Sequence, residues 1–224
     1  MRMRGPTGLV AALALLSLLP FVLLLVTSYA KIVVVFHILR NALGTQQVPP
    51  NSVLAGLALI LTVYVMTPTI EQCQERASPL LEAESEEDLL SKKSADLIIQ
   101  TVDAVKDPVR GFLKRNAAGG NVKMFLDLAR KRAGSEESRK KLGEESFTVL
   151  VPAFVVTELT EAFLIGFVIF LPFLIIELTV SNVLLSLGMH MLSPTQISLP
   201  FKLLLFVAVN GWQLLSHSLV MGYS

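Results

Sequence analysis

The sequence predicts an all-helical, membrane-associated protein in which a polar helical insert separates two apolar parts. Hydrophobic residues make up 53% of the 224-residue chain and the mean hydropathy is +0.63. Only 17% of the residues are charged, against about 25% in an ordinary soluble domain. The charges are also concentrated, because residues 71–147 hold 14 Lys or Arg and 15 Asp or Glu. The predicted domains are therefore 1–70, with apolar helices, 71–147, charged and helical, and 148–224, with broken apolar helices.

The charge balance says little about partners. The formal net charge is +1, which gives no reason to expect a nucleic acid. The two signs nearly balance within 71–147, so the charge of that segment does not indicate what it docks against. Cys73 is the only cysteine, so an intrachain disulfide is impossible and the redox compartment is left open.

The first apolar segment is residues 5–30, which carry no charge and exceed the 20 or so residues that a spanning helix needs. Pro20 is expected to kink this helix. A cleaved signal peptide is the alternative, because Arg2 and Arg4 form a basic start. A spanning helix is favoured, since the apolar run is long and no clear small-x-small cleavage site follows it.

Residues 53–66 are expected to form the apolar part of a second helix. Pro49 and Pro50 precede it and Asn51 is suited to cap it. Fourteen apolar residues are short for a full membrane crossing. The orientation in the membrane stays open, because basic residues lie on both sides of residues 5–30.

The charged segment is expected to be helical and to face water. Apolar residues from Ile98 to Phe112 recur at i, i+4, i+7, i+11 and i+14, which is one face of a helix, and Pro108 should kink it. Asn121 is the expected N-cap of a second helix, and residues 130–132, all basic, should end it. The acidic stretch 82–88 is predicted to be a solvated loop or helix start.

The second apolar part begins near Phe147 and is interrupted by Pro152, Pro172, Pro194 and Pro200. Prolines inside a helix remove a hydrogen bond and favour a break. Broken helices at membrane depth need protein or a water-filled cavity around them. These breaks favour a chain that packs into a larger assembly over an isolated bundle in lipid.

Four charged residues stand in or beside these apolar runs, namely Glu158, Glu161, Glu177 and Lys202. A lone charge at the bilayer centre costs about 2.5–3.5 kcal/mol on insertion scales. Glu161 and Glu177 could lie at segment ends, in the interface, and Lys202 could extend its ammonium there as well. An ion pair between Glu158 and Lys202, within one subunit or between two, would satisfy both charges.

The stretch LGMHMLSPT, residues 187–195, separates two of the apolar segments. Gly188 and Pro194 favour a loop here. In extended backbone Met189 and Met191 would point one way and His190 the other. Flexible thioethers contributed by several subunits could close a pore and still yield to a passing chain. The alternative, which composition alone favours, is a methionine-rich helix end in a core.

Enzyme activity is not predicted. The three histidines, His37, His190 and His217, form no HExxH pattern, and there is no cysteine pair for a metal. The sequence holds no GxSxG elbow and no glycine-rich phosphate loop. We therefore expect no catalytic residue, no metal site and no cofactor.

Two long segments resemble one family. LLPFVLLLVTSYAKIVVVFHILRNALGTQQVPPN (18–51) and VPAFVVTELTEAFLIGFVIFLPFLIIELTVSNVLLSLGMHMLSPTQISLPFKLLLFVAVNGW (151–212) are similar to the two signature blocks of the FliP/SctR proteins. The charged segment between them has the place and size expected in that family. Ser193-Pro194, where flagellar members often carry Pro-Pro, looks more like the injectisome SctR (YscR/HrcR/SpaP-like) branch than flagellar FliP.

The resemblance implies a core component of the type III secretion export gate. Such a protein would lie in the inner membrane of Gram-negative bacteria as a multi-pass protein, assembled largely on the periplasmic side of the apparatus base. It would form a pentameric helical ring with SctS-like and SctT-like partners and meet SctU-like and SctV-like components. Unfolded secreted proteins would pass through the ring.

The resemblance also implies roles for individual residues. The family's methionine gasket falls on Gly188, Met189, His190 and Met191, with His190 in place of the middle methionine. Its imidazole either points away from the lumen or adds a ring whose protonation could repel its copies in a pentamer. Glu158 and Lys202 match charged positions at subunit contacts in the family, and Glu177, where an aspartate is common, is a possible further assembly charge.

A different function is a stand-alone four-segment membrane transporter or channel. A homogeneous, stable monomer or dimer would favour that alternative. An integral-membrane enzyme is a third class, but it would need a catalytic pair that the sequence does not contain.

Overall fold

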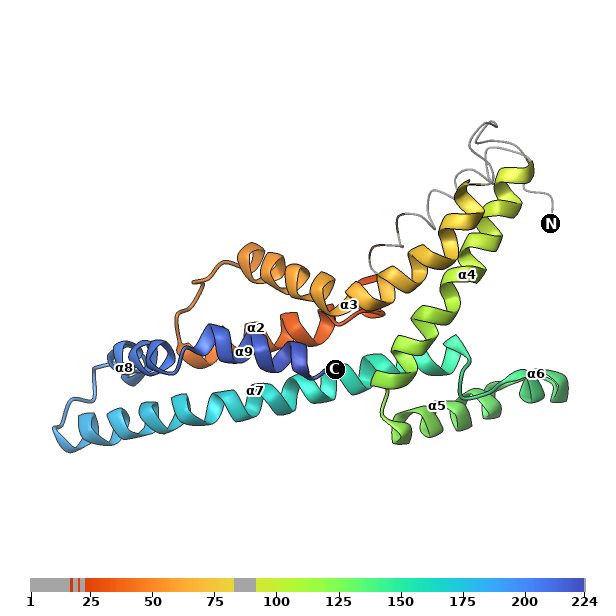
Figure 1. Cartoon of the computed structure of the whole chain (residues 1–224). Coiled ribbons are helices and arrows are strands. Elements are labelled where there is room, and N and C mark those ends of the chain that lie inside the picture. The colour runs from red at the N-terminus through yellow and green to blue at the C-terminus, as the bar shows by residue number, and fades with distance from the viewer. Residues whose placement is uncertain (1–16, 18–19, 21–22, 83–91, 224) are drawn as a thin grey trace. The chain divides into compact units, whose positions relative to one another are not determined.

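The structure, a computed structural model, describes residues 17, 20, 23–82 and 92–223, and all regular secondary structure in them is helical (Figure 1). The predicted all-helical class is confirmed over this part of the chain. Most of the predicted helix 5–30 and nearly all of the acidic stretch 82–88 lie outside the described residues.

The chain divides into two compact units, each made of segments distant in sequence. Unit 1 contains Pro68–Val155 together with the N-terminal residues up to Ala30. Unit 2 contains Lys31–Thr67 and Val156–Ser224. The two longest helices, α3 (Asn51–Glu82) and α7 (Phe147–Ser186), contribute residues to both units. The domain boundaries predicted at residues 70 and 147 stay a prediction.

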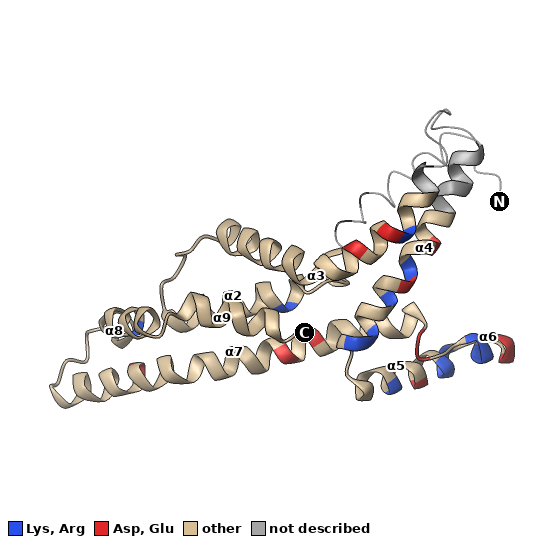
Figure 2. Ribbon diagram, in the orientation of Figure 1, with Lys and Arg blue, Asp and Glu red and all other residues tan. Residues whose placement is uncertain are grey.

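Unit 1 is built from α4 (Lys92–Asn116), α5 (Gly119–Arg132), α6 (Glu136–Lys141) and the parts of α3 and α7 within it. Its core joins α4 to the first turns of α7, where the rings of Phe112 and Phe154 meet edge-on at 5.6 Å between centroids. Val122 and Leu126 are the buried face of α5. Charged side chains are concentrated on α4, α5 and α6, whereas α8 carries only Lys202, α9 carries none and most of α7 is uncharged (Figure 2).

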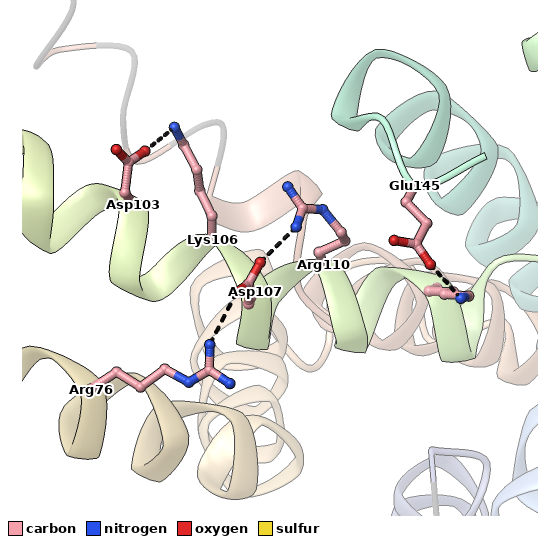
Figure 3. Close-up of polar contacts among 7 residues, drawn as sticks. Arg76, Asp103, Lys106, Asp107, Arg110 and Glu145 are labelled. Atoms are coloured by element: carbon pink, nitrogen blue, oxygen red, sulfur yellow. Dashed lines mark hydrogen bonds and ion pairs between the residues drawn. The ribbon is translucent and has the colours of Figure 1, made fainter. Parts of the chain in front are cut away.

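Exposed ion pairs lie along α4 in unit 1 (Figure 3). They join Arg76 to Asp107 at 3.2 Å, Arg110 to Asp107 at 2.6 Å, Lys106 to Asp103 at 2.5 Å and Lys114 to Glu145 at 2.6 Å. Exposed pairs of this kind contribute about 0–1 kcal/mol each, so the buried apolar residues of unit 1 hold it together.

Two details of unit 1 differ from the sequence predictions. Val102 is 48% exposed, although it shares the predicted apolar face of α4. Helix α5 begins at Gly119 after an extended Ala118, two residues before the predicted cap Asn121. Backbone hydrogen bonding sets the start of α5, because the amide of Val122 already donates to the carbonyl of Ala118 at 3.1 Å. The predicted end of α5 at Arg132 is confirmed.

Unit 2 packs α2 (Tyr29–Leu43), α8 (Pro194–Ala208) and α9 (Gly211–Met221) against the second half of α7. The indole of Trp212 is its aromatic centre, with ring centroids 6.0 Å from Phe36 and 5.5 Å from Phe206. Helices α2 and α7 approach closely at Gly166, where an added Cβ would lie 2.4 Å from the Ile38 side chain. Only glycine allows this approach.

Helix α3 begins at Asn51, directly after Pro50, and contains the predicted apolar residues 53–66. It passes Pro68 and ends at Glu82. Asn51 is its first residue, but the amide oxygen of its side chain accepts a hydrogen bond from Arg40 at 2.6 Å. The predicted apolar part is therefore confirmed, and beyond it the helix continues into polar sequence.

Helix α7 is continuous over 40 residues and includes Pro152 and Pro172, so these two prolines do not break it as predicted. A proline inside a helix costs one hydrogen bond, and a helix can bend there and continue. The break at Pro194 is present, since α8 begins there, but the predicted break at Pro200 is not, because Pro200 lies inside α8. A further break was not predicted: Asn210 adopts a left-handed φ of 51°, and α8 and α9 meet there at a 59° bend.

Within the part of the chain that the structure describes, two helices are long and apolar enough to cross a membrane, Asn51–Pro79 of α3 and Phe147–Ser186 of α7. The bent pair α8 and α9 would be a third crossing if the pair forms one span. Only 11% of the apolar window of α7 is buried within the chain. Its large exposed apolar surface therefore needs lipid or protein to cover it.

Candidate functional site

Residues 187–193, hereafter the methionine loop, connect α7 to α8. Helix α7 ends in a Schellman motif, in which Gly188 has a φ of +73° and the amide of Met189 bonds the carbonyl of Leu184 at 2.9 Å. Pro194 then supplies the first residue of α8, a position where its missing N–H costs nothing. The glycine and the proline thus determine both ends of the loop.

The loop presents its side chains outward. Met191 is 99% exposed, Met189 is 47% exposed and His190 is also exposed. The backbone forms turns at residues 187–188 and 190–191, so the extended backbone considered for the methionine alternation is absent within this chain. In one isolated chain these thioethers contact little, so they are free to contact other molecules.

A buried lysine lies at the base of this hairpin. The ammonium of Lys202, on α8, lies 2.5 Å from a carboxylate oxygen of Glu177 on α7. It also donates a hydrogen bond to the backbone carbonyl of Ala42, near the end of α2, at 3.1 Å. The hydroxyl of Thr195 donates to the other oxygen of Glu177 at 2.6 Å. We call these four groups the Lys202 clamp.

A second buried lysine joins α2 to the first half of α7. The ammonium of Lys31 lies 3.1 Å from Glu158 Oε1 and 2.6 Å from Glu161. It also sits 4.1 Å from the ring centroid of Tyr223, whose hydroxyl donates to the other oxygen of Glu158. Lys31 and Glu158 are both buried. We call these four residues the Lys31 cluster.

Glu158 and Lys202 therefore have different partners within the chain. Glu158 and Glu177 stand 19 residues apart on α7, which is about 28 Å along a helix. The buried acid of one cluster is thus far from the lysine of the other. A Glu158–Lys202 pair between subunits stays a prediction, and forming it would require both intrachain arrangements to exchange partners.

Sequence reasoning missed Lys31, Thr195, Tyr223 and the carbonyl of Ala42. Lys31 carries the same signal as Lys202, a single charge inside an apolar run. Glu158 and Glu161 have the i, i+3 spacing that places two carboxylates on one helix face. That spacing could have indicated a shared cation. No sequence pattern indicates a backbone carbonyl as a partner.

The turn between α2 and α3 is tied to α2 by Arg40. Its guanidinium donates to the carbonyl of Pro49 at 3.2 Å and to the Asn51 amide oxygen at 2.6 Å, and it lies 3.2 Å from the His37 ring. Burial, and secondly the charge of Arg40, lower the pKa of His37. A neutral imidazole can accept a hydrogen bond from the guanidinium. We therefore interpret His37 as a structural residue that helps to hold Arg40 in place.

Unit 2 also contains two cavities of similar size. One, of about 520 Å³, is apolar and opens between α2, α7, α8 and α9, with Phe173, Phe206 and Leu215 among its lining residues. The other, of about 500 Å³, lies beside the Lys202 clamp between the turn after α2 and the start of α8. Among the described residues, no three His, Cys, Asp or Glu side chains come together to hold a metal ion.

The sequence pattern of the FliP family matches residues 12–219, nearly the whole chain. The chain belongs to the FliP family. The resemblance to the FliP/SctR proteins is thereby confirmed over both signature blocks and over the charged segment between them.

Individual relatives support the same assignment. Virulence protein YscR of Salmonella typhimurium is 45% identical, over 98% of each chain. Yop proteins translocation protein R of Yersinia pestis is 44% identical, over 96% of this chain and 95% of its own. Flagellar biosynthetic protein FliP of Bacillus subtilis is 39% identical, over 96% of this chain and 90% of its own. This FliP-family chain is thus more similar to these virulence and translocation proteins than to this flagellar protein, as the sequence predicted.

Proposed function

We propose that this chain is a core component of a type III protein secretion export gate, in which several copies surround a channel for unfolded substrate proteins. Its membership of the FliP family over residues 12–219 carries the proposal. The relatives named for virulence and translocation, at 44–45% identity, favour an injectisome over a flagellum.

The exposed apolar surface of the chain supports an assembly. Phe163, Phe167 and Val168 on α7 are each more than 60% exposed, and surfaces of this size are unfavourable in water. Five copies are expected, together with SctS-like and SctT-like partners and contacts with SctU-like and SctV-like components. The assembly belongs to the bacterial inner membrane and lies largely on its periplasmic side.

The methionine loop is the proposed closure of the channel. Met189 and Met191 project from the end of a hairpin, and their flexible, polarizable side chains can fill an irregular opening and yield to a substrate. The protein supplies a conduit opened by its partners, and it performs no chemistry on the substrate.

Native mass spectrometry of the tagged chain, purified from its own host in mild detergent, tests the proposal. About five copies carrying two kinds of small hydrophobic partner are expected. A homogeneous monomer or dimer without partners would contradict the export gate and favour a stand-alone transporter or channel.

A further inference from the structure

The Lys202 clamp connects three helices through a single ammonium. Lys202 belongs to α8, its carboxylate partner Glu177 to α7, and the carbonyl of Ala42 to α2. The ammonium is buried, and in a low-dielectric interior such charge-assisted bonds are strong and directional. Thr195 adds a second link between Glu177 and the first turn of α8. The two arms that carry the methionine loop are therefore joined at their base.

The hairpin beyond this point is largely exposed. Leu178, Val183, Leu185 and Leu187 are each more than 50% exposed, and exposure reaches 99% at Met191. Segments with few buried apolar contacts move most easily relative to the rest of a fold. The clamp thus separates a held base from an exposed tip.

The turn after α2 closes over the clamp. Gly44 has a φ of +77°, and a Cβ added there would lie 3.1 Å from the methyl carbon of Thr195 and 3.9 Å from the Lys202 ammonium. Backbone rather than a side chain therefore covers the buried charge on that side. The position of α8 is thereby set against both α2 and α7.

We propose that Lys202 is the positioning residue of the methionine loop: its clamp holds the start of α8 against α7 and α2 and so keeps the loop in its closed position. This inference rests on the proposed function, since it assigns a role in the same gate. Loosening the clamp lets the start of α8 separate from α7 and displaces the loop, so that the closed gate leaks.

The test uses membrane vesicles that contain the complete secretion apparatus, loaded with a small fluorescent anion. Lys202→Met, which keeps the apolar stem and removes the charge, is expected to increase efflux several-fold over the wild type. Lys114→Met is the matched control, because it removes an ammonium from an exposed pair of 2.6 Å in unit 1 and should leave efflux unchanged. Efflux from Lys202→Met vesicles at the wild-type rate, with the complex assembled, would overturn the proposal.

A charge exchange separates the three-way clamp from a simple ion pair. The double variant Glu177→Lys with Lys202→Glu restores opposite charges but leaves the carbonyl of Ala42 without its donor. We expect it to leak, whereas the conservative Lys202→Arg, which keeps a donor, should leak less than Lys202→Met. Full restoration of closure by the exchange would show that α2 is not part of the clamp.

Loop position is read directly by labelling a Met191→Cys variant with a thiol reagent in a Cys73→Ser background. The labelling rate is expected to rise when Lys202→Met is added, and an unchanged rate would count against the clamp. If Lys202→Met does not assemble, Thr195→Val decides, since it removes one hydroxyl and no charge and should produce a smaller leak.

The proposed function and this inference fail differently. Replacing Met189 and Met191 together by alanine should cause a leak if the methionine loop closes the channel, and the absence of that leak would contradict the gate itself. A leak from the alanine variant with tight closure in every clamp variant would leave the gate standing and reject the role of Lys202.

Discussion

Buried lysines determine much of this protein at the scale of single residues. Lys31 and Lys202 are almost fully buried, and each bonds groups on two further segments of unit 2. A buried charge is tolerated when its hydrogen-bonding capacity is used, and removing one partner leaves the other uncompensated. Each cluster thus tolerates changes at its members poorly.

Lys31→Met is expected to destabilise the protein by about 3–5 kcal/mol, because it leaves the buried carboxylate of Glu158 without its cation. The double variant with Glu158→Gln should lose less than the single variant, since the uncompensated charge is then removed. Thermal unfolding of the purified proteins in one detergent measures both. A double variant less stable than Lys31→Met would contradict this account of the cluster.

Gly44→Ala is expected to destabilise unit 2 by about 1–2 kcal/mol, since a residue with a Cβ is strained at positive φ. The added methyl would also press on Thr195, 3.1 Å from its site. Gly56→Ala is the matched control, because a Cβ at this exposed position inside α3 meets nothing within 4 Å. That change should instead stabilise the helix by about 0.5–1 kcal/mol. Equal effects of the two substitutions on thermal unfolding would contradict the prediction.

At the scale of elements, α4 is joined to the segment before α7 by the exposed pair Lys114–Glu145. The hydrogen bond from Lys114, together with its charge, holds the pKa of Glu145 below its usual value. The bond to Glu145 likewise raises the pKa of Lys114. The pair therefore contributes its full stabilisation of unit 1 at pH values between the ordinary pKa of a glutamate and the ordinary pKa of a lysine.

This contribution should disappear in acid, as the pH falls through the lowered pKa of Glu145, and in alkali, as it rises through the raised pKa of Lys114. The difference in unfolding temperature between the wild type and Glu145→Gln should be small at neutral pH and vanish in acid. Raising the salt concentration should also reduce it. A difference that persists in acid would show that Glu145 acts through packing rather than charge.

At the scale of the whole molecule, the chain exposes more apolar surface than a stable monomer in water can tolerate. The exposed residues include the middle of α7, where Phe167 is 63% exposed. The same helix contributes buried residues to both units. Its outer face is therefore expected to meet lipid or other subunits.

Phe167→Lys is expected to prevent assembly or membrane insertion, because a charge in a lipid-facing or subunit-facing position costs about 2.5–3.5 kcal/mol. Leu128→Lys is the control, since Leu128 is 46% exposed on α5 among charged residues. Native electrophoresis of detergent-solubilised membranes measures the assembled fraction. Normal assembly of Phe167→Lys would indicate that this face of α7 contacts water.

Much of the fold was predictable because it depends on local chemistry. The all-helical class, the start of α7 at Phe147, the end of α5 at Arg132 and the break at Pro194 follow from patterns within a few residues. The errors arose at the prolines, because a proline can bend a helix without ending it. Pro152 and Pro172 lie within α7, and Pro200 lies within α8.

The amino-acid sequence was sufficient to predict the family, the membrane-associated helical class and the position of the methionine loop. These depend on hydropathy, on glycine and proline, and on two long blocks of residues, 18–51 and 151–212. It also indicated that Glu158 and Lys202 need partners, since a charge in an apolar run is costly. The folded chain alone decided which partners they have. Lys202 meets Glu177 and the carbonyl of Ala42, and Glu158 meets Lys31 and Tyr223. Such pairings join residues up to 160 positions apart, and they form only after the apolar faces of the helices have packed.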